Sequence, residues 1–572
     1  MGNSLYVPDP KNIIEKFGAE AVVYDRFEDM YYEPFWVNNA MYIKEFRLVA
    51  GDTSHKRIEQ VDFVVGSGHQ TRSYLMQREG YLYEMPITWY VIKNIWDLSP
   101  GYHDGNNSRF DREIGEECMA CHTGNFDLEK GSKNRFKKVN LGIDCEQCHG
   151  PGSAHVKAIG EGQLIDVGVE TDYTIVNPAK LPANLQFDVC QQCHLQGVNA
   201  LKDRGSVRDF RPGMALGDAY HVFLEQPENP DAFGIASHAE RLQESECFIQ
   251  SKGKLTCTTC HDPHKSITIT EQDVYIRQCE NCHQGTMIPD CAESDSVMNL
   301  ANGDCISCHM PQRGTRDIPH VFFHDHKIRI VGDSLPPNTQ KINALASRLH
   351  CATGTPPNDA EGRALLRYFE EHNPKAEYLP LAEGLLAPGS RYARARLSFT
   401  QGNLVQARAL AEAELATNPA WVDVQFLLGE ILMAQGQHAE AVGVFDKAVE
   451  IASEASEAAF LAGIALLKSR PGDMDVLREA RPRFASLLER RPFDARLHNN
   501  LGFIALNLGE GAQAQYHLEE ALKLDPDYAE ALETMTWLHV TLGQKESARD
   551  YFERLVRVDD TRPGLVRLKE RL

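Results

Sequence analysis

The feature that most constrains this chain is a five-residue pattern, Cys-x-x-Cys-His, which occurs six times between residues 118 and 309. These copies use twelve of the fifteen cysteines. With 15 cysteines and 22 histidines in 572 residues, not even one copy is expected by chance. The copies are Cys118–Cys121–His122, Cys145–Cys148–His149, Cys190–Cys193–His194, Cys257–Cys260–His261, Cys279–Cys282–His283 and Cys305–Cys308–His309.

This pattern is the attachment signature of c-type haem. Two thiols three residues apart lie on one helical turn and can bond the two vinyl-derived carbons at one porphyrin edge. The adjoining histidine then binds the iron as its proximal ligand. A zinc ribbon needs four ligands from two Cys-x-x-Cys knuckles and has no use for a histidine after each one. The sequence therefore predicts six covalent haems c, with the twelve cysteines as attachment points and the six adjoining histidines as proximal ligands.

The multihaem domain is predicted to span residues 106–335, and the segment from Cys118 to His326 offers roughly 35 residues for each motif. Such a region cannot build much side-chain core, so we expect the haems themselves to stack as its core. Gly, Pro, Asn and Asp are frequent between the motifs, which predicts short helices joined by loops.

A second axial ligand decides what each haem iron does. Histidine gives a low-potential electron carrier, methionine raises the potential, and an open position admits a substrate. His155 and His264 follow their own motifs too closely to bind the same iron, so each is predicted to reach a neighbouring haem. We favour His320 and His326 from a run of histidines, with His324 as the alternative. The six predicted distal ligands are His69, His155, His238, His264, His320 and His326, and the other spare histidines are His55, His103 and His221.

Three cysteines lie outside the motifs. Cys247 and Cys291 are a candidate disulfide if the chain is exported. Otherwise they and Cys351 are small packed apolar residues.

The first 105 residues read as β-structure. Alternating aromatic and β-branched residues predict strands at 21–27, 41–49, 57–68 and 81–91. We expect a small antiparallel β region that caps the haem stack. Its aromatic residues, among them Trp36, Tyr83 and Trp89, either shield a porphyrin face or form an ordinary core.

From about residue 388 the composition is helical, and a period of 34 residues appears, as between Gly402 and Gly436 or Gly509 and Gly543. This pattern resembles the tetratricopeptide repeat, two antiparallel helices that stack into a superhelix. Residues 336–387 are predicted to be a helical linker. The repeat groove is expected to bind a protein partner, and a structural or dimerising arm is the alternative. The predicted units are 388–421, 422–455, 456–494, 495–528 and 529–562, followed by a capping helix to Leu572.

The net charge is −22, from 81 acidic and 59 basic residues. This argues against nucleic acid as a partner, because nucleic acid needs a basic face. No stretch reaches the roughly 18 apolar residues of a membrane helix. No secretory signal is visible within residues 1–30. Since haem is attached to apocytochrome c outside the cytoplasm, we expect a periplasmic or extracellular protein whose given sequence is truncated or begins at a misassigned start.

The whole pattern resembles the multihaem cytochromes with C-terminal tetratricopeptide repeats of environmental bacteria. The strings CHGPGSAH, CQQCHLQG and CTTCHDPH make the haem part similar to the tetrahaem cytochromes that accept electrons in ammonia oxidation and to doubled-CXXCH proteins. In that family the first string typically supplies a distal histidine, which implies this role for His155. Similar proteins usually carry an export signal and one more haem motif upstream.

The sequence thus predicts a mixed architecture of three parts: a small N-terminal antiparallel β region, a loop-rich multihaem domain and an all-α repeat superhelix. Its predicted function is electron transfer through six haems, with the repeats docking a redox partner. The alternative is a multihaem oxidoreductase that acts on a small nitrogen or sulfur compound at one five-coordinate haem. No Cys-x-x-Cys-Lys attachment site is present, which favours the carrier.

Overall fold

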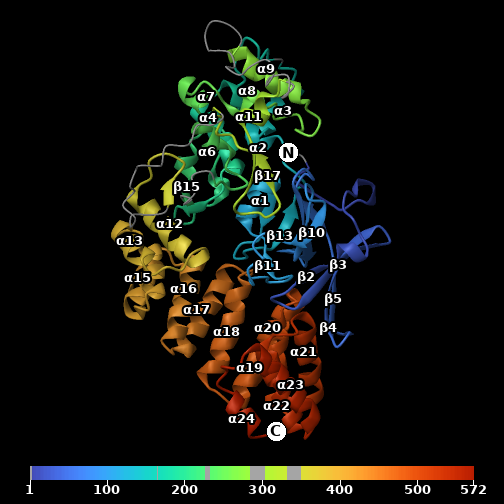
Figure 1. Cartoon of the computed structure of the whole chain (residues 1–572). Coiled ribbons are helices and arrows are strands. Elements are labelled where there is room, and N and C mark those ends of the chain that lie inside the picture. Colours follow the sequence, from blue (N-terminus) through green and yellow to red (C-terminus); the bar gives the residue numbers. More distant parts are fainter. Residues whose placement is uncertain (1–2, 164, 226–231, 284–302, 331–348) are drawn as a thin grey trace.

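The computed structural model describes residues 3–163, 165–225, 232–283, 303–330 and 349–572. The part with the six motifs lies at one end of the molecule and the C-terminal helices lie at the other (Figure 1). The β-rich N-terminal part lies beside both. The three-part architecture predicted from the sequence is therefore confirmed.

The N-terminal part consists of two antiparallel sheets that share one core, where the sequence predicted one small sheet. In β3 alternate side chains are buried, as expected for a strand with one face on a core. Four strands are ordered β2-β3-β4-β5, and the other sheet runs β1-β6-β7-β8-β11 with β9 and β10 at its side. The strands are β1 (Leu5–Tyr6), β2 (Val23–Asp25), β3 (Met30–Val37), β4 (Ala40–Val49), β5 (Asp52–Gln60), β6 (Phe63–Val65), β7 (Thr71–Arg78), β8 (Tyr81–Glu84), β9 (Ile87–Tyr90), β10 (Ile95–Leu98) and β11 (Arg112–Glu113).

Two predicted strands are each divided in the structure. The run 81–91 breaks into β8 and β9 at Pro86, because proline has no N–H to donate to a sheet ladder. The run 57–68 divides between β5 and β6, which belong to different sheets. Trp89 and Tyr83 are buried in the shared core and Trp36 packs against it. These aromatic side chains therefore form an ordinary core.

The motif-bearing part is made of short helices and loops, as predicted, with three small sheets added. Its sheets are β12–β13, β14–β15–β18 and β16–β17. The elements are α1 (Glu116–His122), β12 (Phe126–Leu128), β13 (Phe136–Val139), α2 (Glu146–His149), α3 (Ser153–Gly160), α4 (Ala183–His194), β14 (Val198–Leu201), α5 (Leu216–Ala219), β15 (Tyr220–Glu225), α6 (His238–Gln243), α7 (Glu246–Gln250), α8 (Cys257–Cys260), α9 (Gln272–His283), α11 (Cys305–His309), β16 (Gln312–Gly314), β17 (Phe322–His324) and β18 (Leu349–Cys351).

The C-terminal part is a row of antiparallel helix pairs, and each predicted repeat unit contains one pair. Glycines let the helices of a pair approach closely. A Cβ on Gly429 would lie 2.7 Å from Cδ1 of Phe445, and one on Gly463 would lie 2.8 Å from Cε1 of Phe484. The helices are α14 (Arg391–Thr400), α15 (Leu404–Thr417), α16 (Val422–Ala434), α17 (His438–Ile451), α18 (Ser456–Ser469), α19 (Met474–Arg490), α20 (Ala495–Asn507), α21 (Gly511–Leu524), α22 (Ala529–Thr541), α23 (Lys545–Val558) and the capping α24 (Leu565–Lys569).

The described part of the predicted linker begins with β18, which belongs to a sheet of the motif-bearing part, and continues as a helix pair, α12 (Asn358–Glu371) and α13 (Tyr378–Leu385). These helices share a hydrophobic cluster with Val198 of β14, Phe223 of β15 and Leu397 of α14. The linker is therefore packed against the motif-bearing part on one side and the first repeat on the other.

The loops that connect one repeat to the next contact the rest of the molecule. At the start of the third repeat, the hydroxyl of Ser456, the first residue of α18, lies 2.7 Å from the Tyr81 hydroxyl. Phe493, before the fourth repeat, packs edge-on against Tyr83 with ring centroids 5.5 Å apart. Asp525, before the fifth, pairs with Arg109 at 2.8 Å. The repeats are thus held along one edge by the N-terminal part.

Candidate haem sites

Each haem-attachment motif lies at the end of a short helix. The histidine is the last residue of α1, α2, α4, α9 and α11, and in the fourth motif it follows α8 in extended conformation. The two cysteines of a motif are three residues apart on a helix, so they lie on the same face.

In the attachment histidines His149 and His309, Nδ1 is held by a backbone carbonyl. Nδ1 of His149 lies 2.8 Å from the carbonyl oxygen of Val176, and Nδ1 of His309 lies 2.8 Å from that of Arg329. An imidazole that donates its Nδ1–H to a carbonyl presents Nε2 as the free lone pair. These two histidines are therefore in the tautomer that a haem iron requires.

His122, in the first motif, has a different environment. Its Nδ1 is buried without a hydrogen-bond partner in the described part of the chain. Burial lowers the pKa of His122 and so favours the neutral imidazole. Only the neutral form can be a metal ligand.

Two histidines from other segments face attachment histidines. The rings of His149 and His264 are 6.1 Å apart between centroids and 17° from parallel. The rings of His261 and His326 are 6.2 Å apart and 27° from parallel. A metal–imidazole bond is about 2 Å long, which places the ring centres of two ligands on opposite sides of one iron about 6 Å apart. At these ring separations, His149 with His264 and His261 with His326 would each be able to hold one haem iron between them.

A third pair is closer and crossed. The rings of His194 and His238 are 5.5 Å apart at 80°. His238 also lies 4.9 Å from the ring of His326. Burial lowers the pKa of His238 to about 3 and that of His326 to about 4, so both are neutral imidazoles.

Within the described residues, no ring contact joins the other three predicted distal histidines to an attachment histidine, and their role as distal ligands stays a prediction. His155 lies beside Asp172, with Nδ1 2.7 Å from a carboxylate oxygen. His69 is exposed in a turn. His320 has its Nε2 2.7 Å from Asp97, and the pairing of His320 with Asp97 is a contact that sequence reasoning missed. The alternative His324 contacts the carbonyl oxygen of Met310 through Nδ1, at 2.6 Å.

Thiols of different motifs lie next to one another. The thiols of Cys121 and Cys193 lie close enough to shift each other's pKa, as do those of Cys190 and Cys257. Further along, α8 packs on α9 and α9 packs on α11. The first, third, fourth, fifth and sixth motifs therefore form a continuous series. Cys247 lies within electrostatic range of Cys260 and Cys282, whereas its predicted disulfide partner Cys291 is outside the described residues.

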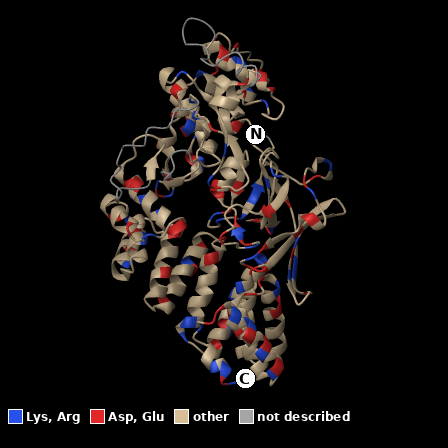
Figure 2. Cartoon of the chain, in the orientation of Figure 1, with Lys and Arg blue, Asp and Glu red and all other residues tan. Residues whose placement is uncertain are grey.

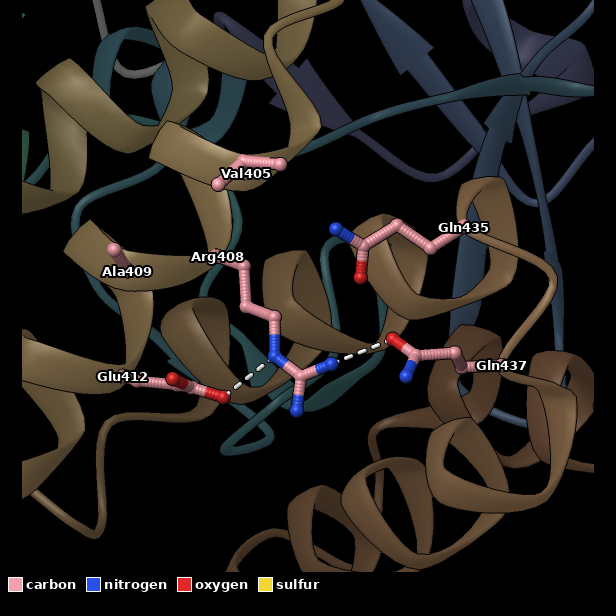
Figure 3. Close-up of a pocket in the computed structure, with 6 residues that line it drawn as sticks. All are labelled: Val405, Arg408, Ala409, Glu412, Gln435 and Gln437. Atoms are coloured by element: carbon pink, nitrogen blue, oxygen red, sulfur yellow. Dashed lines mark hydrogen bonds and ion pairs between the residues drawn. The ribbon is translucent and has the colours of Figure 1, made fainter.

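A separate hollow of about 470 Å³ lies on the repeats (Figure 3). Arg408 of α15 crosses it, with hydrogen bonds to Glu412 at 2.7 Å and to Gln437 at 2.5 Å. Its lining contains no cysteine or histidine. This hollow is a polar surface feature of the repeats and is unrelated to the haem motifs.

Comparison with known proteins agrees with the description of the motif-bearing part and with that of the repeats. A family model described as cytochrome c554 and c-prime matches residues 102–150. Models described as tetratricopeptide repeat match residues 392–457, 477–529 and 505–572. A solved thermophilic tetratricopeptide-repeat protein of Thermus thermophilus is 19% identical, with a TM-score of 0.28, over 32% of this chain and 98% of that one.

Two curated relatives are multihaem proteins or enzymes. The multiheme cytochrome MtrA of Shewanella baltica is 25% identical over 39% of this chain and 60% of its own length. The dissimilatory sulfite reductase MccA of Wolinella succinogenes is 23% identical over 34% of this chain and 27% of its own length. The chain thus spans less than two thirds of either relative.

The motifs, the opposed histidines and these matches define a c-type cytochrome with several haems. More particularly, the chain is a multihaem cytochrome with C-terminal tetratricopeptide repeats and a segment of cytochrome c554 type. Among the described helices, none combines the length and apolar character needed to cross a bilayer.

Proposed function

We propose that this chain holds six haems c and passes electrons along them, while the repeats dock a redox partner. The observation that carries the proposal is the pair of opposed imidazoles, His149 with His264 and His261 with His326, at 6.1 and 6.2 Å. When bound, haem c supplies a one-electron iron couple. Two histidines on one iron leave no position for a substrate, which suits a carrier.

The chain's own residues would hold each group in place. The paired cysteines anchor one edge, and the proximal histidine reaches the iron through Nε2. The carbonyl oxygens of Val176 and Arg329 keep two of these rings in the required tautomer and orientation. The neighbouring thiols of different motifs support a close series of haems, as electron transfer between them requires.

The repeats are the candidate docking surface. The residues where one repeat joins the next, Ser456, Phe493 and Asp525, already contact the N-terminal part. Acidic and basic residues are interspersed over the remaining helix surfaces (Figure 2). A partner would therefore bind these helix surfaces. We place the protein in the periplasm or outside the cell, where c-type haem is attached.

The test is expression of the full chain in a host with working cytochrome c maturation. We expect a mass increase of six haems per chain and low-spin ferric spectra. The double variant Cys118→Ala/Cys121→Ala should carry five haems, whereas the matched control Cys351→Ala should carry six. A colourless protein with the mass of its amino acids alone would refute the proposal.

One observation favours a second function, a reductase of a small sulfur or nitrogen compound. The chain is similar to a protein named as a dissimilatory sulfite reductase. In the described part of the chain, no histidine ring is opposed to His122 as His264 is to His149. A high-spin haem signal that shifts when sulfite or nitrite is added would favour this function over the carrier.

A further inference from the structure

Three metal-binding side chains converge away from the paired haem-ligand histidines. Asp97, His103 and His320 each offer one ligand atom, and these atoms all lie within 4.8 Å of one another. The Asp97 carboxylate oxygen Oδ2 is 2.7 Å from Nε2 of His320 and 3.4 Å from Nε2 of His103. Two imidazoles and a carboxylate are the donor set of many sites for zinc and related ions.

The fold fixes each of the three residues. Asp97 lies in β10 opposite Thr88 of β9, and its other carboxylate oxygen accepts a hydrogen bond from the Leu98 N–H at 2.8 Å. His103 follows the turn that the Tyr102 N–H closes on the carbonyl oxygen of Ser99 at 3.0 Å. Such hydrogen bonding from the surrounding shell is what orients metal ligands in known sites.

His320 is held in a conformation that costs free energy. Its φ is +60°, in the left-handed region that few non-glycine residues adopt. Its ring packs edge-on against Tyr90 with centroids 4.9 Å apart. The side-chain amide of Gln70 donates to the carbonyl oxygen of Phe322 at 2.9 Å, which ties the following strand to the N-terminal sheet. Strain of this kind clusters at ligand-binding positions.

Hydrogen bonding alone does not account for the cluster. Nε2 of His103 is buried but has no hydrogen-bond partner within the described residues, since 3.4 Å with poor alignment to Asp97 is not a bond. Ligands of a tetrahedral zinc ion lie about 3.4 Å apart when the bonds are about 2 Å long. The printed separations, 2.7 and 3.4 Å from Asp97 Oδ2, lie near this value, and all three ligand atoms are within 4.8 Å of one another.

We propose that Asp97, His103 and His320 bind one divalent transition-metal ion of the zinc class, with water in the remaining position. Each side chain retains 31% of its exposure, so the ion and its water can reach the site. The ion links β10 and the turn after it to the segment before β17. That segment supplies His320, which is 223 residues from Asp97 in the sequence. This assigns His320 to the ion in place of the haem iron predicted from the sequence.

The test uses the haem-loaded full chain, in which attachment thiols and proximal imidazoles are occupied. After removal of metal with a chelator, Zn²⁺ binding is measured by equilibrium dialysis and elemental analysis. We expect one Zn²⁺ per chain, and affinity lowered at least about 100-fold in both Asp97→Asn and His103→Gln, because each removes one of three protein ligands. The controls Asp104→Asn and His372→Gln alter exposed residues outside the cluster and should bind as the parent does.

Two further readouts keep the result unambiguous. The haem content and visible spectrum of His103→Gln should equal those of the parent, which shows that the variant folds. Zn²⁺ should raise the thermal unfolding midpoint of the parent and leave that of both ligand variants unchanged. Equal Zn²⁺ binding by parent and variants, or no binding by the parent at micromolar Zn²⁺, would overturn the site.

Discussion

The nitrogen that a histidine leaves free decides what that residue can bind. His149 directs Nδ1 to the carbonyl oxygen of Val176, so Nε2 remains for the iron. In His55, by contrast, Nε2 is the nitrogen that is bonded. It lies 2.8 Å from the Glu45 carboxylate, so His55 is part of an ionic network. Sequence spacing could not separate these cases, because the hydrogen-bond partners come from distant segments.

At the residue scale, His264→Ala tests the opposed pair most directly. Removing this imidazole leaves the iron bound by His149 with one open position. We expect electron paramagnetic resonance to show one of the six haems converted from low-spin to high-spin, with all six still attached. The exposed His372→Ala is the control and should leave the spectrum unchanged. An unchanged spectrum for His264→Ala would assign the second ligand to another residue.

A buried carboxylate gives a prediction for stability and pH. Burial raises the pKa of Glu45, but the charge and hydrogen bonds of Arg109, with the hydrogen bond to His55, lower it more. The net pKa is below its ordinary value of 4.5. The resulting stability is therefore fully present above pH 4.5 and is lost as the pH falls toward the lowered pKa. Urea unfolding at pH 7 and at pH 3, followed by circular dichroism, should show a lower free energy of unfolding at pH 3.

The variant Glu45→Gln isolates this contribution. It leaves Arg109 buried without its full partner, so the expected cost is about 3–5 kcal/mol at pH 7. The difference in the free energy of unfolding between pH 7 and pH 3 should be smaller in this variant than in the parent. The control Glu33→Gln breaks a partly exposed pair with Lys44 and should cost less than about 1 kcal/mol. Equal costs for the two variants would contradict the role of the buried network.

At the scale of elements, the repeat helices depend on glycine where they cross. Gly429→Ala would place a Cβ 2.7 Å from Cδ1 of Phe445, so we expect a loss of about 1–3 kcal/mol from overpacking. The matched control is Gly443→Ala in the interior of α17, where no atom lies within 4 Å of the added Cβ. That change should stabilise the helix by up to about 1 kcal/mol. Urea unfolding followed at the helix signal measures both, and equal shifts would contradict this packing.

The elements differ in how far the sequence could predict them. The repeats and the motif helices follow from local periodicity and from fixed spacings such as Gly402 to Gly436. The partition of the N-terminal strands into two sheets does not, since it depends on which strands pair across long distances. The pairing of His264 with His149 and of His320 with Asp97 likewise needs segments 115 and 223 residues apart to meet.

At the scale of the whole molecule, the repeats are attached along an edge. Arg47 pairs with Asp527 at 2.8 Å, and Arg109 pairs with Asp525 at 2.8 Å, both in the loop before the last repeat. Arg109 is 8% exposed, so this contact is little screened by solvent. The position of the last repeats relative to the N-terminal part is therefore supported by ion pairs whose charges can be reversed.

The double variant Asp525→Lys/Asp527→Lys places like charges opposite Arg109 and Arg47. We expect the last repeats to separate from the N-terminal part, since like charges in contact repel, and the radius of gyration from small-angle scattering to increase. Asp550→Lys/Glu553→Lys makes the same change of net charge on the exposed face of α23 and should leave the radius unchanged.

Exchanging the charges of Arg47 and Asp527 distinguishes charge repulsion from a general loss of folding. Asp527→Lys alone should weaken the contact between the last repeats and the N-terminal part. The double variant Arg47→Asp/Asp527→Lys restores opposite charges at this contact, so its scattering curve should return toward that of the parent. If the radius stays constant in every variant, the aromatic packing of Phe493 on Tyr81 and Tyr83 holds this contact without these ion pairs. The repeats would then be anchored by apolar burial, which salt does not screen, and their attachment would persist at high ionic strength.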